Sequence, residues 1–211
     1  MMKKFLLALA AAWLVAGIPG YAAGATPPDV LARSVTDEVL AVLRTDKDIH
    51  SGNPKKVIDL IEGKVLPHFN FVRMTQLAMG KNWRQASSEQ QKELVGQFRV
   101  LLVRTYAAAF TAYRNQTIDY KPLRMQPNDE EVVVKSQIVQ SGGPPVTIDY
   151  SMEKTDRGWK VYDVAIEGVS LVQNYRSTFA SEVQKGGIDG LIRSLGAKNR
   201  QLAQQTQVTK Q

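Results

Sequence analysis

The side chains that could carry chemistry in this sequence are few. It contains two histidines, His50 and His68, and no cysteine, so thiol chemistry has no candidate residue. Neither histidine lies at a spacing typical of a metal site or a catalytic triad. The sequence also lacks a glycine-rich phosphate loop, a nucleophile elbow and a His-Glu-x-x-His motif. We therefore predict no metal, no cofactor and no enzymatic activity, and we assign both histidines to packing or surface roles.

Three carboxylates lie in segments that alternate with a period of two residues, as strands do. Asp119 and Asp149 alternate with apolar neighbours and fall on the polar faces of their segments. Asp163 shares its face with Val161, which makes it the best candidate for a buried general acid or base. A structural hydrogen bond or ion pair is the more common role for such a group. One alternative function is thus a small pocket-type isomerase or hydratase in which Asp163 is the acid/base.

The first 25 residues have the pattern of a secretory signal peptide. A basic start, Lys3 and Lys4, precedes a short apolar run, and small residues precede the expected cleavage after Ala25. The run is shorter than the roughly 20 residues that a spanning helix needs. We expect export to the bacterial periplasm and removal of residues 1–25. An uncleaved N-terminal anchor is the alternative.

Charge and cysteine content fit an exported protein. The net charge is +7, and Lys3 and Lys4 supply two of these charges, which leaves +5 on residues 26–211. A basic balance suits nucleic acid, an anionic membrane surface or an acidic protein, and export removes most of the case for nucleic acid. With no disulfide to form in an oxidising compartment, stability must come from a packed core.

Hydrophobic periodicity predicts helices first, then strands, then helices again. Apolar residues recur at spacings of three and four in the helical segments and alternate in the strands. We predict one α+β domain over residues 26–203, a twisted four-stranded antiparallel sheet covered by about six to seven helices, and a disordered polar tail over 204–211. The predicted helices cover about 28–43, 54–67, 70–79, 88–113, 169–183 and 188–202, and the strands cover 117–123, 131–140, 146–154 and 159–166.

Several blocks of the sequence resemble the MlaC family. The longest are residues 83–91 (WRQASSEQQ), 162–172 (YDVAIEGVSLV) and 187–192 (GIDGLI), joined by shorter matches between them. The resemblance covers roughly residues 30–202. Members of this family are periplasmic phospholipid-binding proteins of the Mla pathway, also known as toluene-tolerance auxiliary proteins.

The resemblance implies a carrier that shuttles phospholipid between two membrane complexes and so maintains outer-membrane lipid asymmetry. One is an outer-membrane lipoprotein–porin complex, and the other is an inner-membrane complex of an MCE-domain protein with an ABC transporter. It also implies an apolar cavity between sheet and helices that holds the acyl chains of the cargo, with the headgroup near solvent. We expect a monomer, because a shuttle must diffuse and dock.

The residues that would line this cavity lie on the apolar faces of the predicted elements. Periodicity alone does not distinguish a hollow core from a solid one, and a solid core would favour an envelope adaptor that binds no ligand. Asn174 and Arg176 flank the last apolar stripe and are predicted to meet a phosphate at the mouth, with a structural ion pair as the alternative for Arg176. We expect about half of the set to touch lipid. The predicted apolar lining is Met74, Leu77, Phe98, Leu101, Leu102, Tyr106, Ala109, Val146, Ile148, Tyr150, Met152, Val161, Ile166, Val169, Val172, Tyr175 and Phe179.

Overall fold

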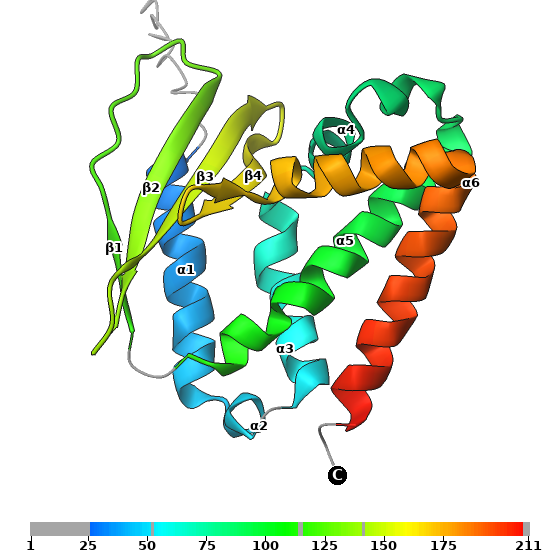
Figure 1. The fold of residues 1–211 in the computed structure, drawn as a ribbon. Helices are drawn as coiled ribbons and strands as arrows, with labels where there is room; N and C mark the ends of the chain where they lie inside the picture. Colours follow the sequence, from blue (N-terminus) through cyan, green and yellow to red (C-terminus); the bar gives the residue numbers. More distant parts are fainter. Residues whose placement is uncertain (1–25, 52, 114–115, 141, 209–211) are drawn as a thin grey trace, which may run out of the picture.

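A computed structural model describes residues 26–51, 53–113, 116–140 and 142–208 of the chain. Its elements follow the predicted order of helices, strands and helices, and helices cover one face of an antiparallel sheet (Figure 1). The predicted α+β class is therefore confirmed. The predicted signal peptide lies outside the described residues.

The N-terminal helices change their winding along the chain. Helix α1 spans Pro28–Thr45 and is followed by α2, Lys47–His50, and α3, Pro54–Leu60. The helix continues from α3 as a π-helix, η1 (Ile61–Val65), and then as a 3-10 turn, η2 (Leu66–His68). Proline lacks an N–H, and its ring clashes with the carbonyl four residues earlier, so Pro67 accounts for the loss of regular winding here. Helix α4, Phe71–Met79, and a 3-10 turn, η3 (Gly80–Gln85), complete this half.

Helix α5, Ser88–Thr111, begins at a capping box of Ser87 and Gln90. The sequence indicates Ser87 or Ser88 as the cap, with Gln90 or Gln91 completing the box. The backbone N–H of Gln90 donates to the Ser87 hydroxyl (3.2 Å), and the Ser87 N–H donates to the Gln90 side-chain oxygen (2.9 Å). Two N–H groups that would otherwise have no partner at the helix start are thereby satisfied. This fixes where the longest predicted helix enters the fold.

Within the described residues the sheet has five strands rather than the four predicted. The strands pair in chain order, each antiparallel to the next. They are β1 (Thr117–Tyr120), β2 (Glu131–Val139), β3 (Val146–Thr155), β4 (Gly158–Ile166) and β5 (Val169–Ser170). Strand β5 forms because Glu167 and Gly168 both have positive φ, 50° and 80°, as a two-residue hairpin turn requires. The helix that we predicted from residue 169 therefore starts two residues later.

Helix α6, Leu171–Val208, consists of two arms joined by a kink. Gly187 has φ 66° and ψ −172°, a backbone conformation that glycine adopts without a Cβ penalty. The break predicted between the helices over 169–183 and 188–202 is thus a sharp bend, after which the second arm runs back beside α5 (Figure 1). The second arm continues to Val208, into the segment that we predicted as a polar tail.

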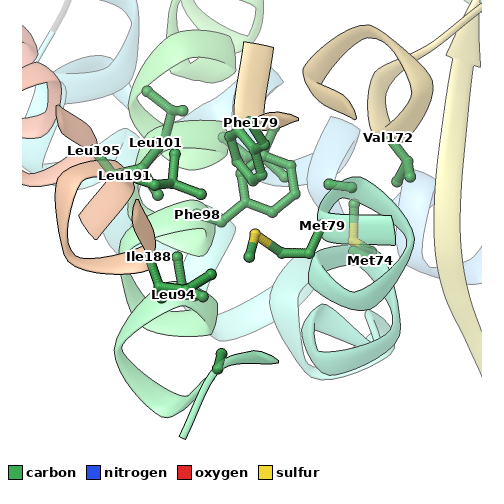
Figure 2. Close-up of a cluster of buried hydrophobic side chains, with 13 residues drawn as sticks. Met74, Met79, Leu94, Phe98, Leu101, Val172, Phe179, Ile188, Leu191 and Leu195 are labelled. Carbon is green, nitrogen blue, oxygen red and sulfur yellow. The ribbon is translucent and has the colours of Figure 1, made fainter. Parts of the chain in front are cut away.

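Buried side chains gather in three clusters. One lies among α4, α5 and both arms of α6, and we call it the helical core; Figure 2 shows Phe98 from α5 beside Phe179 from α6 in it. A second joins α1, α3 and α5. The third covers the inner face of the sheet and includes Val134, Met152 and Val161. The site described next lies between these clusters.

Candidate functional site

A cavity of about 360 Å³ separates the inner face of the sheet from the helices. This volume lies within the roughly 300–1,000 Å³ typical of small-molecule sites. Its walls come from α1, η1, η2, α4, α5, the first residue of α6 and the first four strands, so no single element defines it. The interior predicted between sheet and helices is therefore hollow.

The sheet wall follows directly from strand alternation. Ile148, Tyr150 and Met152 on β3 point to one face because successive side chains alternate. The antiparallel register places Ile166 opposite Ile148 and Val161 opposite Met152. All five line the cavity, as the sequence predicts for an inward-facing apolar stripe.

The helical wall comes mainly from α1, α4 and α5, of which α4 and α5 were predicted to contribute. On α5, spacings of three and four residues bring Leu102, Tyr106 and Ala109 to the cavity. The facing helix is α1, whose apolar stripe we had not placed at the site. Residues Ile61 and Val65 of the π-helix also contribute, and such segments are frequent at functional sites. The lining residues that the sequence analysis missed include Leu31, Val35, Val39, Leu40, Leu43, Leu66, Phe69, Phe71, Val103, Phe110, Tyr113, Ile118, Ile138, Val164 and Leu171.

Several predicted residues do not lie on the cavity wall. The apolar stripe of the first α6 arm packs into the helical core instead, where the Phe98 ring lies 5.1 Å from that of Tyr175 and 5.0 Å from that of Phe179. Periodicity identified this stripe as buried but not which element lies opposite. The predicted residues off the wall are Leu77, Phe98, Leu101, Val146, Val169, Val172, Asn174, Tyr175, Arg176 and Phe179, whereas Met74, Leu102, Tyr106, Ala109, Ile148, Tyr150, Met152, Val161 and Ile166 lie on it.

The two polar residues predicted at the mouth lie on exposed positions of α6. Arg176 reaches back over Gly80, where a Cβ would lie 3.2 Å from its Nε. Its guanidinium forms no ion pair with any described residue. Val169 is 58 % exposed on the short strand before α6. A phosphate contact by Asn174 or Arg176 remains a prediction.

The polar groups on the wall are few and mostly have partners inside the protein. The Thr36 hydroxyl is 2.6 Å from the Tyr120 hydroxyl, and Tyr113 accepts from Arg44 Nε at 3.1 Å. The hydroxyl of Tyr150 is hydrogen-bonded to Ser136, and burial raises the pKa of Tyr150 above its usual value. No Lys, Arg, Asp or Glu is among the described residues that line the cavity.

His68 does not add a charge to this wall at neutral pH. It lies on η2 and is half-buried. Burial is the main cause that lowers its pKa below the ordinary value near 6.5, and the nearby charge of Lys160 lowers it further. The imidazole is therefore neutral at pH 7, so the cavity presents an uncharged, predominantly apolar surface.

Hydrogen bonds and ion pairs hold the walls in place. Tyr120 on β1 donates to the Ala32 carbonyl of α1 at 3.0 Å, which ties this helix to the sheet. At the start of α4, Arg73 forms ion pairs with Glu131 and Glu153 and lies 3.7 Å over the ring of Tyr162. Neither of these interactions was predicted from the sequence, because the residues that form them lie far apart along the chain.

Asp163, the candidate acid/base, has a structural environment. Its carboxylate accepts hydrogen bonds from the backbone N–H groups of Val164 (2.9 Å) and Val172 (3.1 Å) and from the Ser170 hydroxyl. Ser170 in turn caps α6 by accepting from the N–H of Gln173. Asp163 is not among the residues that line the cavity. Its carboxylate thus fixes the turn from β5 into α6.

Replacing Asp163 by Ala is expected to lower the free energy of unfolding by about 1–3 kcal/mol, because two buried N–H groups and a hydroxyl lose their acceptor. Urea unfolding followed by circular dichroism measures this change. Asp149→Ala is the matched control, since this strand carboxylate has only a long 4.0 Å ion pair with exposed Lys135, and it should cost less than about 0.5 kcal/mol. Equal effects of the two substitutions would contradict the structural role of Asp163.

Two further features of the described residues concern metal binding and membrane spanning. No group of three or more His, Asp or Glu side chains within these ranges is arranged to hold a metal ion. None of the helices in the described part of the chain is long and apolar enough to cross a membrane. His50 is the last residue of the short helix α2.

Comparisons with known proteins agree with this site. The family model described as MlaC protein matches residues 33–197. The intermembrane phospholipid transport system binding protein MlaC of Haemophilus influenzae is 25% identical over 170 residues, which are 79% of each chain. The toluene tolerance protein ttg2D of Pseudomonas putida is 25% identical over 189 residues, 89% of this chain and 85% of that protein.

A solved structure also shares the fold. A phospholipid-binding protein from Ralstonia solanacearum, determined in complex with a phospholipid at 1.53 Å resolution, is 42% identical to this chain. The TM-score is 0.80, and the match covers 84% of this chain and 99% of that one. The arrangement of sheet and helices described above is thus found in a protein whose bound ligand is known.

Proposed function

Because this chain belongs to the MlaC family, we propose that it binds a phospholipid in the cavity and carries it through the periplasm. The observation that supports this most directly is the uncharged wall between sheet and helices. Acyl chains need such a surface, and no charged side chain among the described lining residues must be desolvated to admit them. The lipid-bound relative from Ralstonia solanacearum supports the same assignment.

The energetics favour a tightly held ligand. Each buried methylene contributes roughly 0.8 kcal/mol, so two acyl chains contribute on the order of 20 kcal/mol before the costs of binding. A phospholipid in the cavity would then leave spontaneously into water only very slowly. We therefore propose that delivery needs a docking partner, as in a shuttle between an outer-membrane and an inner-membrane complex. The name of the Haemophilus influenzae relative, an intermembrane transport component, supports this step.

Native mass spectrometry of the full-length protein, expressed in Gram-negative bacteria and purified from the periplasm, tests the proposal. We expect a complex heavier than the mature polypeptide by the mass of phospholipid, and recovery of that phospholipid by organic extraction. The same mature mass tests cleavage after Ala25. Protein that carries no phospholipid after expression, and takes up none from phosphatidylglycerol vesicles, would contradict the proposal.

Neither alternative function has the structural feature that it requires. An adaptor without ligand required a solid core, whereas a cavity of about 360 Å³ is present. The isomerase or hydratase required Asp163 in a pocket, whereas its carboxylate is hydrogen-bonded to the β5–α6 turn and lies off the cavity wall. The carrier is the function that the geometry supports best.

A further inference from the structure

Two polar side chains on the cavity wall have no hydrogen-bond partner among the described residues. Thr36, Tyr113 and Tyr150 are hydrogen-bonded to other protein groups. The hydroxyl of Tyr106 and the imidazole of His68 are not. A polar group at an apolar wall that lacks a protein partner marks a place where a ligand atom could supply one.

The half-buried ring of Tyr106 is packed, whereas its hydroxyl has no hydrogen-bond partner among the described residues. Its ring packs against the helical core from the α5 side, next to Tyr175. No hydrogen bond joins the Tyr106 and Tyr175 hydroxyls, and Tyr175 has the Thr105 side chain as a neighbour. Burial raises the pKa of Tyr106 above 10, so the hydroxyl keeps its proton and acts as a donor at neutral pH.

The position of Tyr106 along α5 places it just inside the cavity. Ala109, one helical turn further on, also lines the cavity but is exposed to solvent. Leu102, one turn earlier, is buried. Residues three and four apart on a helix are neighbours about 5–6 Å apart, so Tyr106 lies between a solvated turn and a dry one. His68 differs, since it lies near the charges of Lys160 and Glu38.

This intermediate position matches one part of a phospholipid. The phosphate needs solvent, the acyl chains need the dry wall, and the glycerol ester carbonyls lie between the two. A carbonyl taken out of water is costly unless it accepts a hydrogen bond. We infer that the Tyr106 hydroxyl donates a hydrogen bond to an ester carbonyl of the bound phospholipid and so sets how deep the lipid sits. This inference rests on the proposed function.

Substituting Tyr106 by Phe tests it with two probes, dioleoyl phosphatidylglycerol and its dialkyl ether analogue, which lacks both ester carbonyls. Each lipid competes with a fluorescent phospholipid for delipidated protein. Tyr106→Phe should weaken binding of the diester roughly two- to tenfold, the range for one hydrogen bond, and leave binding of the diether unchanged. The wild-type protein should prefer the diester by the same factor.

Tyr162→Phe is the matched control, because the Tyr162 hydroxyl donates to the Glu131 carboxylate at 3.0 Å and this residue does not line the cavity. The control variant should bind the diester and the diether with the same affinities as the wild-type protein. Equal weakening of diester and diether by Tyr106→Phe, or no weakening of either, would overturn the inference while leaving the carrier function intact. Failure of the wild-type protein to bind either lipid would overturn the carrier function as well.

Discussion

Replacing Ile148 by Asp is expected to abolish phospholipid binding, with at least a roughly 100-fold loss of affinity. Ile148 lines the cavity on β3 and lies opposite Ile166 on β4. An aspartate there faces hydrocarbon in the loaded state, and a buried polar group without a partner costs roughly 2–7 kcal/mol. Native mass spectrometry should therefore find the variant without phospholipid.

Thr147→Asp provides the control for this substitution. Thr147 is the preceding residue of β3, is exposed, and points to the opposite face of the sheet. Both variants place the same poor strand former in the same strand, so any general effect on β3 is shared. Thr147→Asp should keep its phospholipid. If Ile148→Asp folds, as circular dichroism reports, and still carries lipid, the cavity is not the binding site.

Truncating Phe98 to Ala is expected to lower the free energy of unfolding of the delipidated protein by about 3–5 kcal/mol. The side chain is fully buried in the helical core and makes edge-on contacts with the rings of Tyr175 and Phe179. Its removal leaves a cavity in a well-packed region and forfeits both ring contacts. Urea unfolding of lipid-free protein measures the loss, because a ligand that binds only the folded state would raise apparent stability.

Phe110→Ala is the comparison for Phe98→Ala. Phe110 lies on the same helix but borders the existing cavity and is half-buried. Its truncation widens a space that is already empty, so it should cost distinctly less than Phe98→Ala. Any folded fraction of Phe98→Ala should still bind phospholipid, since Phe98 does not line the cavity. Equal losses of stability would contradict the separation of helical core and cavity.

Local sequence signals predicted the elements well. A Ser at 87 or 88 followed by a Gln at 90 or 91 indicated the start of α5, and the alternation of Ile148, Tyr150 and Met152 indicated the inward face of β3. These features depend on residues close together in the chain. Strand β5 was not predicted because a two-residue strand is too short to show an alternating pattern. The π-helix η1 was not predicted because its winding departs from the residue spacing of a regular α-helix.

The composition of the site was only partly predictable. Periodicity shows that a stripe is buried, but not what it is buried against. The stripes of α1 and of the first α6 arm look alike in the sequence, yet α1 faces the cavity and α6 faces Phe98. The contacts that decide this, such as the bond from Tyr120 to Ala32, join residues far apart in the chain. The existence of a hollow interior was suggested by the resemblance, not by the pattern.

The apolar residues of this protein are divided between a solid region and a hollow one. The helical core of α4, α5 and α6 is complete without any ligand, whereas the space beside the sheet is where cargo would lie. Folding therefore does not have to wait for loading, and unloading leaves most of the scaffold's contacts as they were. Under the proposed carrier function, a molecule that has released its phospholipid can therefore stay folded and be loaded again.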